Sequence, residues 1–334
     1  MYKFLRNALI LVVSAFALSA NAEPMAFSIN TDSGNTDTED SLYLIDLATG
    51  TGERKGKLAS GIVGDVRRDT EGLAFINDTL WGIDDDSLTL FPISTKTGTI
   101  SFAEQIKLLE FPSGGSNDFG MTFSCDNTLY VTSVTTKTLY QVEINEEGMN
   151  GTFKAVGSEG ALGARISAIA AIGNPTKLFG LGNGQFQNGT TDSPNLYSIN
   201  PDTGVAKLIG SLGNAVGAYN QGGMTFDSTG KLWAITDRRV INNSIENLPS
   251  QILSINTKTG EATVVSDTSK IGKSGEVGFE SLAIASPSPC RIALGFETSE
   301  ETVPTVPTLG LAGRALAILL LMLGGVTILR RRSD

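Results

Sequence analysis

A short pattern that returns along the chain limits what this sequence can fold into. The copy LYSINPDTG spans residues 196–204, and its relatives begin at Leu42, Leu90, Leu139 and Ile252. In each copy apolar and polar residues alternate before a polar turn that closes on glycine, as when a half-buried strand enters a hairpin. A second pattern, EGLAF at 71–75, has relatives that begin at Phe119, Ile166, Gly222 and Glu280. Both patterns therefore belong to one repeating unit.

The order of strands within this unit predicts its architecture. Each full unit holds an EGLAF-like strand, a strand such as 80–83, an LYSI-like strand and a further strand after the TG turn. Four antiparallel strands per unit are typical of a propeller blade. The LYSI-like copies begin at 42, 90, 139, 196 and 252, so the later units are longer and we expect insertions in their loops. Aromatic residues that recur at one place in each unit are expected in the core between blades: Trp81, Tyr130, Phe179 and Trp233.

The chain begins part-way through a unit. Its first unit, at 25–58, lacks the EGLAF-like strand, and the last recognisable strand, at 280–285, has no successor. We expect this C-terminal strand to join the N-terminal blade, which closes the ring without a free edge. The predicted fold class is all-β: a five-bladed β-propeller, with six blades as the alternative, followed by a C-terminal transmembrane helix.

The N-terminal residues have the pattern of a secretory signal peptide. Lys3 and Arg6 precede an apolar run at 8–18 and a small-x-small cleavage site at 20–22. We expect cleavage after residue 22, and a retained membrane anchor is the alternative.

An apolar segment near the C-terminus, at 309–329, is long enough to span a bilayer. Arg330, Arg331 and Arg332 follow it as a membrane stop, which belongs on the cytoplasmic side and places the preceding chain outside the cytoplasm. The predicted organisation is a signal peptide (1–22), a β-propeller (23–296), a linker with a sorting motif (297–308), and a transmembrane helix with a basic tail (309–334).

The residues before this segment are Val306, Pro307, Thr308 and Leu309. This motif, the apolar segment and the arginines together resemble the IPTL-type and PEP-type C-terminal sorting signals of Gram-negative bacteria. The usual isoleucine is valine here, and the acidic-aromatic residues that often follow the motif are absent. The resemblance implies an exosortase-like membrane protease as a partner, which acts at the periplasmic face of the inner membrane before the protein reaches the cell surface or the medium. An uncleaved membrane anchor is the alternative.

The composition excludes several classes of function. The chain has no histidine, which excludes histidine-dependent catalytic triads, general bases and zinc sites. Its formal net charge of −10 becomes more negative once the basic ends are removed, so nucleic acid is not an expected partner. The two cysteines, Cys125 and Cys290, are expected on the face opposite the acidic loops, and a disulfide between them is a hypothesis.

Acidic residues that depart from the repeat form the candidate site. In a propeller, the start of each innermost strand lies on the same face as the loop that leaves the second strand. This geometry brings Glu71 and Glu280 to one mouth of the central channel, together with Asp84 and Asp237. Carboxylate oxygens suit Ca²⁺, so these four residues are the candidate metal ligands. Further acids on this face are Asp85, Asp86 and Asp118. Ion pairs with arginines of the same face are the alternative, and the candidates are Arg67, Arg68, Arg165, Arg238 and Arg239.

The Glu-Gly pair at 71–72 before an apolar strand, with aspartates after the next strand, resembles the gluconolactonases and related calcium-dependent propeller hydrolases. That resemblance implies a Ca²⁺-dependent lactonase or esterase with an acidic site at the channel mouth. Those enzymes have six blades and a wider ligand set, which does not map onto this sequence. Because no pair of a nucleophile and a base is evident, we expect an exported binding protein instead, whose ligand is an extracellular polysaccharide or a surface protein. No catalytic residue is assigned.

Overall fold

The computed structural model describes residues 24–31, 35, 37–59, 69–111, 117–145, 148–184, 186–187, 190–191, 194–242, 244–272 and 275–284. These residues form β-strands and turns with two short 3₁₀ helices, η1 (Phe102–Glu104) and η2 (Thr268–Lys270), and none of them lies in an α-helix. The all-β prediction is confirmed. No helix in this part of the chain is long and apolar enough to cross a membrane. The predicted signal peptide (1–22), linker (297–308) and transmembrane tail (309–334) lie outside the described residues.

Four-stranded antiparallel sheets are the main unit of the structure. The first has the order β24 (Ala283–Ile284), β1 (Met25–Ile29), β2 (Ser41–Asp46) and β3 (Gly52–Lys57). Another has the order β12 (Ile166–Ile172), β13 (Lys177–Gly182), β16 (Asn195–Ile199) and β17 (Ala206–Ser211). The last has the order β18 (Gly222–Phe226), β19 (Leu232–Thr236), β22 (Gln251–Ile255) and β23 (Ala262–Asp267). In each of the last two sheets the chain runs through the strands in the order that the repeat predicts.

Two further units are joined into one eight-stranded sheet. One half is β4 (Thr70–Ile76), β5 (Thr79–Asp84), β6 (Thr89–Ile93) and β7 (Ile106–Leu109). The other half is β8 (Phe119–Phe123), β9 (Leu129–Ser133), β10 (Thr138–Ile144) and β11 (Asn150–Ala155). Their outer strands β7 and β11 pair in parallel, which the sequence does not predict. β7 lies between the two halves, with two residue pairs to β6 on one edge and three to β11 on the other.

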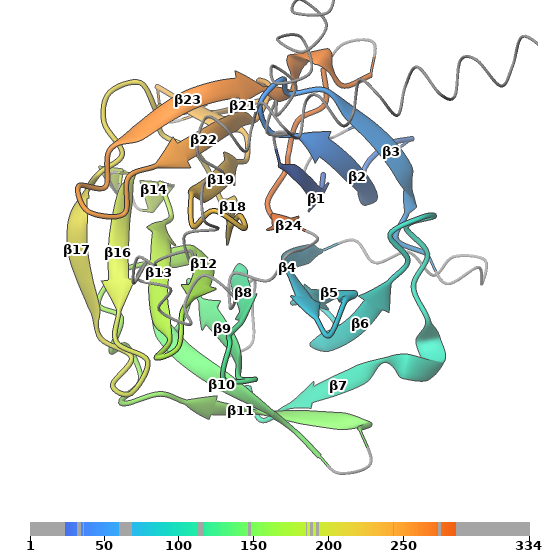
Figure 1. The fold of residues 1–334 in the computed structure, drawn as a ribbon, viewed down its shortest axis with the longest axis vertical. Helices are drawn as coiled ribbons and strands as arrows, with labels where there is room; N and C mark the ends of the chain where they lie inside the picture. Colours follow the sequence, from blue (N-terminus) through green and yellow to red (C-terminus); the bar gives the residue numbers. More distant parts are fainter. Residues whose placement is uncertain are drawn as a thin grey trace, which may run out of the picture. The chain divides into compact units, whose positions relative to one another are not determined.

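The inner strands of these units meet around a common centre (Figure 1). β4, β8, β12, β18 and β24 contact one another in this order, and β24 contacts β4 again. β24 also pairs antiparallel with β1, with Ala283 opposite Phe27 and Ile284 opposite Ala26. The predicted pairing of the C-terminal strand with the N-terminal unit is therefore confirmed. Side chains add to it, because Ser28 Oγ donates to the Ser281 carbonyl and Ile29 N donates to Ser281 Oγ at 3.3 Å.

The apolar core of the described residues is divided into clusters that each join two neighbouring units. Trp233 is fully buried in the cluster between the last sheet and the first. Tyr130 is buried between the β8–β11 unit and the β12–β17 sheet, while Trp81 and Phe179 are half-buried against equivalent clusters. The Phe179 ring meets Phe226 of the next unit edge-on, with centroids 5.5 Å apart. These aromatics pack between units, as their periodicity predicts.

The longer spacing of the later units has a structural cause. A small hairpin, β14 (Phe186–Gln187) with β15 (Thr190–Thr191), is inserted between β13 and β16. A second hairpin, β20 (Arg239–Ile241) with β21 (Ser244–Glu246), is inserted between β19 and β22. The predicted lengthening in loops is confirmed. Both insertions follow the second strand of a unit, so they lie on the face where the inner strands begin, which the sequence does not predict.

Candidate functional site

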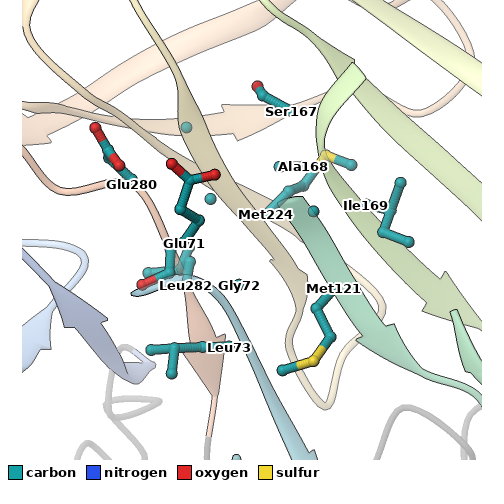
Figure 2. Close-up of a pocket in the computed structure, with 14 residues that line it drawn as sticks. Glu71, Gly72, Leu73, Met121, Ser167, Ala168, Ile169, Met224, Glu280 and Leu282 are labelled. Carbon is teal, nitrogen blue, oxygen red and sulfur yellow. The ribbon is translucent and has the colours of Figure 1, made fainter. Parts of the chain in front are cut away.

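The inner strands surround a narrow pocket of about 180 Å³ (Figure 2). Its polar lining comes from Glu71, Ser167, Glu280 and Ser281, and its apolar lining includes Leu73, Met121 and Met224. A second pocket, of about 440 Å³, is lined by later residues of the same strands, among them three phenylalanines, Phe75, Phe123 and Phe226. The centre of the ring is therefore acidic where the inner strands begin and apolar where they end.

Small residues allow the inner strands to approach closely. An added Cβ at Gly72 would lie 2.6 Å from Met121 Cβ, and one at Gly120 would lie 2.9 Å from the Ala168 Cα. Atoms cannot pack at such separations, so these glycines of the EGLAF-like pattern are required by the approach of β4 to β8 and of β8 to β12. The narrowness of the pocket follows from the same contacts.

Glu71 is the most connected acid of the site. The residue is 4% exposed. Phe119 N donates to its Oε2 at 2.6 Å, and Gln221 Nε2 donates to its Oε1 at 3.3 Å. Gln221 Nε2 also donates to Asp118 Oδ1 at 2.9 Å. Burial, followed by the negative charges of Asp118, Asp85 and Asp69, raises the pKa of Glu71 well above its usual range. This carboxyl therefore keeps its proton to a higher pH than an ordinary glutamate does.

The structure separates the four predicted metal ligands into two groups. Glu71 and Glu280 line the same pocket, whereas Asp84 and Asp237 do not. Asp84 Oδ1 accepts hydrogen bonds from Ser87 N at 2.7 Å and from Ser87 Oγ at 2.5 Å, so it stabilises its own turn. Asp237 is fully buried, and its Oδ2 lies 3.3 Å from Arg238 Nε, the kind of ion pair that the sequence offers as the alternative. A Ca²⁺ site made by all four residues stays a prediction.

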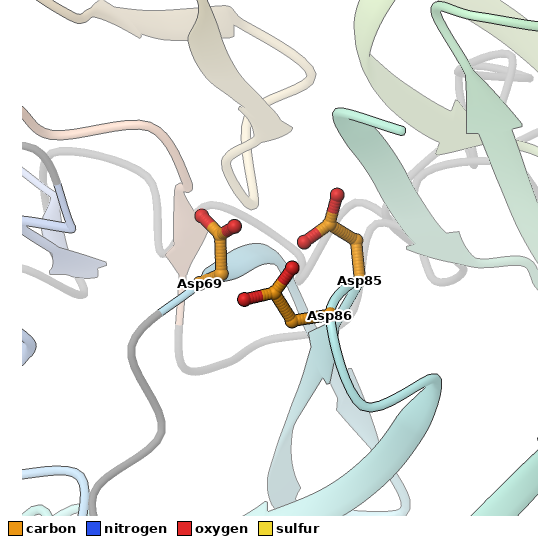
Figure 3. A group of neighbouring side chains, drawn as sticks. All are labelled: Asp69, Asp85 and Asp86. Atoms are coloured by element: carbon orange, nitrogen blue, oxygen red, sulfur yellow. The ribbon is translucent and has the colours of Figure 1, made fainter. Parts of the chain in front are cut away.

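A different group of acids lies next to the pocket. Oxygen atoms of Asp69, Asp85 and Asp86 lie within 4.8 Å of one another, and their carboxyl groups turn toward a common point (Figure 3). Asp85 is buried and Asp86 is exposed. Sequence reasoning places Asp85 and Asp86 on this face but misses Asp69, Ser167 and Gln221. Their signal is position, because each lies within two residues of the start of an EGLAF-like copy.

The structure describes only some of the other predicted residues. Cys125 is disulfide-bonded, but Cys290 lies outside the described residues, so the pairing with Cys290 stays a prediction. Arg165 is buried, and Arg239 is part of β20. The remaining predicted residues also lie outside the described part of the chain: Arg67, Arg68, Val306, Pro307, Thr308, Leu309, Arg330, Arg331 and Arg332.

Comparison with known proteins supports the repeat in the first half of the chain. The family described as a repeat of unknown function, DUF6923, matches residues 27–167. No curated protein matches the sequence.

Solved structures that are similar to this chain have low identity to it. Virginiamycin B lyase from Staphylococcus aureus, in selenomethionine-substituted form, is 17% identical with a TM-score of 0.37, over 73% of this chain and 70% of that chain. The Dos1 propeller is 11% identical with a TM-score of 0.35, over 66% and 54% of the two chains. The PQQ-bound aldose sugar dehydrogenase from Streptomyces coelicolor is 16% identical with a TM-score of 0.37, over 61% and 62%. Likeness at this level says nothing of activity.

Proposed function

We propose that this chain is an exported five-bladed β-propeller that binds an extracellular polysaccharide at the acidic mouth of its central pocket. Carboxylate oxygens at the mouth can accept hydrogen bonds from sugar hydroxyls. The role is binding rather than catalysis. A surface protein as the ligand is the other outcome of the test below.

The blade count is supported by the core. Among the described residues there are five hydrophobic clusters, and each joins a different pair of neighbouring units. The closed cycle of contacts among the inner strands supports the same count. On this view the eight-stranded sheet is two blades whose outer strands have paired.

One observation carries the binding proposal: polar side chains from separate inner strands are hydrogen-bonded to one another at the mouth. Gln221, next to β18, links Glu71 of β4 to Asp118, next to β8. These bonds hold the groups in fixed positions before any ligand arrives, which lowers the entropic cost of binding. The 180 Å³ of the pocket includes open solvent, and its cavity volume is only about 10 Å³, far below the roughly 300–1,000 Å³ of typical small-molecule sites. The ligand therefore lies across the face and does not enter the ring.

Export and sorting are part of the proposal and rest on the sequence. The signal peptide at 1–22 delivers the chain across the inner membrane, and the motif at 306–309 directs it to an exosortase-like protease. The acidic body then remains soluble at the cell surface or in the medium, because its net negative charge opposes self-association.

An array of immobilised bacterial polysaccharides and surface proteins tests the binding role. We expect the wild type to bind polysaccharide, and Asp118→Asn to weaken that binding at least tenfold by removing a charged acceptor at the mouth. Asp202→Asn, in an exposed turn, is the matched control and should bind as the wild type does. Binding to proteins alone, or equal binding by both variants, would contradict the polysaccharide proposal.

A Ca²⁺-dependent hydrolase is the second candidate, and the raised pKa of Glu71 favours it. A carboxyl that keeps its proton to a higher pH than an ordinary glutamate can act as a general acid. Assays of lactone and ester hydrolysis with and without Ca²⁺ distinguish the two roles. Turnover that Glu71→Gln abolishes would favour the enzyme, and no turnover under either condition would favour binding.

A further inference from the structure

Three carboxylates meet where β4 begins and β5 ends. The pairing of β4 with β5 sets Thr70 opposite Asp84, so Asp69 and Asp85 face each other just beyond the strand ends. A main-chain bond from Asp85 N to the Asp69 carbonyl, at 3.3 Å, fixes this arrangement. Like charges directly opposite each other in a sheet repel. Asp86 brings a third carboxylate to within 4.8 Å of the other two.

Asp85 is buried within this group of carboxylates. Its side chain is 3% exposed, and its Oδ2 accepts a hydrogen bond from Asn117 N at 2.7 Å. Its other oxygen, Oδ1, is buried and receives no hydrogen bond from an N–H or hydroxyl group of the described residues; the side chain that interacts with it is another acid, Asp69. The carboxyl group turns toward Asp69 and Asp86 (Figure 3). A buried carboxylate oxygen without a donor is costly unless a cation lies beside it.

Comparison with other units shows how the charge of a buried aspartate at this position is balanced elsewhere in the molecule. The main-chain bond recurs from Val134 N to the Asp118 carbonyl, from Asn183 N to that of Arg165, and from Asp237 N to that of Gln221. In the last of these units a buried aspartate, Asp237, stands where Asp85 stands. The residue after it is Arg238, whose Nε lies 3.3 Å from the Asp237 carboxylate. The equivalent of Arg238 in the β4–β5 unit is Asp86, so an acid replaces the built-in cation.

We propose that Asp69, Asp85 and Asp86 bind a divalent cation of the Ca²⁺ class. All the side-chain donors are hard oxygens, which suit Ca²⁺ and Mg²⁺ rather than softer metals. Ca²⁺ tolerates irregular geometry and six to eight ligands, so water completes its shell on the exposed side of Asp86. These residues are not the four ligands that the sequence predicts, and the proposal is independent of polysaccharide binding.

The cation has a structural consequence. It ties the turn after β5 to the start of β4, and the Asn117–Asp85 bond extends that tie to the chain before β8. Bound Ca²⁺ therefore stabilises the acidic face where two units meet.

Thermal unfolding of the full chain in detergent, followed by tryptophan fluorescence, tests the site. After EDTA treatment, CaCl₂ at about a hundredfold excess over its Kd should raise the Tm by roughly 5 °C. Asp86→Asn should lose most of this shift. Asp202→Asn and Glu280→Gln should keep it, because one lies in an exposed turn and the other at the central pocket.

A second variant keeps the test decisive if Asp86→Asn folds poorly. Asp86→Arg copies the Asp237–Arg238 pair, so it should unfold without Ca²⁺ close to the Tm of the Ca²⁺-loaded wild type and should not respond to Ca²⁺. An absent Ca²⁺ response in the wild type would overturn the proposal. So would a full response in Asp86→Arg, or a response lost in Glu280→Gln.

Discussion

Individual polar side chains stabilise buried aromatic residues of the repeat by accepting hydrogen bonds from them. Trp233 is fully buried, and its indole Nε1 donates to Asp227 Oδ2 at 2.8 Å. The other oxygen of Asp227 accepts from Thr229 N at 2.8 Å and from Lys231 N at 3.0 Å. Burial alone would raise the pKa of Asp227, but the hydrogen bonds from Thr229, Trp233 and Lys231 outweigh it and lower the pKa. This aspartate therefore joins a tight turn to the core between units.

Replacing Asp227 by alanine should destabilise the fold. The indole N–H of Trp233 would lose its acceptor, which costs about 1–3 kcal/mol. Because the pKa of Asp227 is lower in the folded state, its contribution is present above the unfolded pKa and is lost as the pH falls. Urea unfolding at pH 7 and pH 3 should show a large difference between variant and wild type at pH 7 and a smaller one at pH 3. An equal difference at both pH values would contradict this role.

For Glu71 we expect the folding stability to depend on pH in the opposite direction. Burial and the charges of Asp118, Asp85 and Asp69 raise its folded pKa, so the folded state holds an extra proton between the ordinary value of 4.5 and that raised pKa. Stability should therefore fall as the pH rises through this window. In Glu71→Gln the fall should be smaller, and at pH 8 the variant should match or exceed the wild type in urea unfolding with EDTA present, so that no Ca²⁺ neutralises Asp69 and Asp85. Curves that stay parallel from pH 5 to pH 8 would refute this assignment.

At the scale of strands, the sequence repeat predicts the order of strands within a unit, but it does not predict how the outer strands of two units pair. The inner, second, third and fourth strands follow from patterns that recur in every unit, as the order β18, β19, β22 and β23 shows. The parallel pairing of β7 with β11 could not be predicted. It joins the outer edges of two units, and it produces no pattern of apolar and polar residues that would reveal it in the sequence. The group at Asp69 was missed for a related reason. A register shift between Thr70 and Gly72 decides which residue faces Asp85, and the sequence does not reveal such a shift.

The closing segment should contribute to stability through Phe279. This side chain is fully buried, and its ring meets Tyr43 edge-on with centroids 5.3 Å apart. Phe279→Ala should lower the free energy of unfolding by about 3–5 kcal/mol, because it opens a cavity in the cluster that joins the last sheet to the first. Val265→Ala, on the outer strand β23, should cost far less because Val265 is 36% exposed. Similar losses in both variants would argue against a stabilising role of the closure.

At the scale of the whole molecule, the proposed function assigns localisation to the predicted signal peptide and sorting motif at the two ends of the chain. The tail repeats a Val-Pro-Thr sequence, at 303–305 and at 306–308, and only the second copy is followed by leucine. Replacing Pro307 and Thr308 by alanine should leave the protein in the membrane fraction. The same change at Pro304 and Thr305 is the matched control and should leave release unchanged. Immunoblots of cell fractions measure both, and release of the first variant would count against exosortase-like processing.

The proposed fold and the site at its centre both depend on a ring of five units that is closed by the C-terminal strand. A crystal structure of residues 23–296 measures this directly. We predict five four-stranded blades, with β24 paired to β1 and the inner strands in a single closed cycle. A sixth blade, or a β1 edge without β24 beside it, would contradict the account.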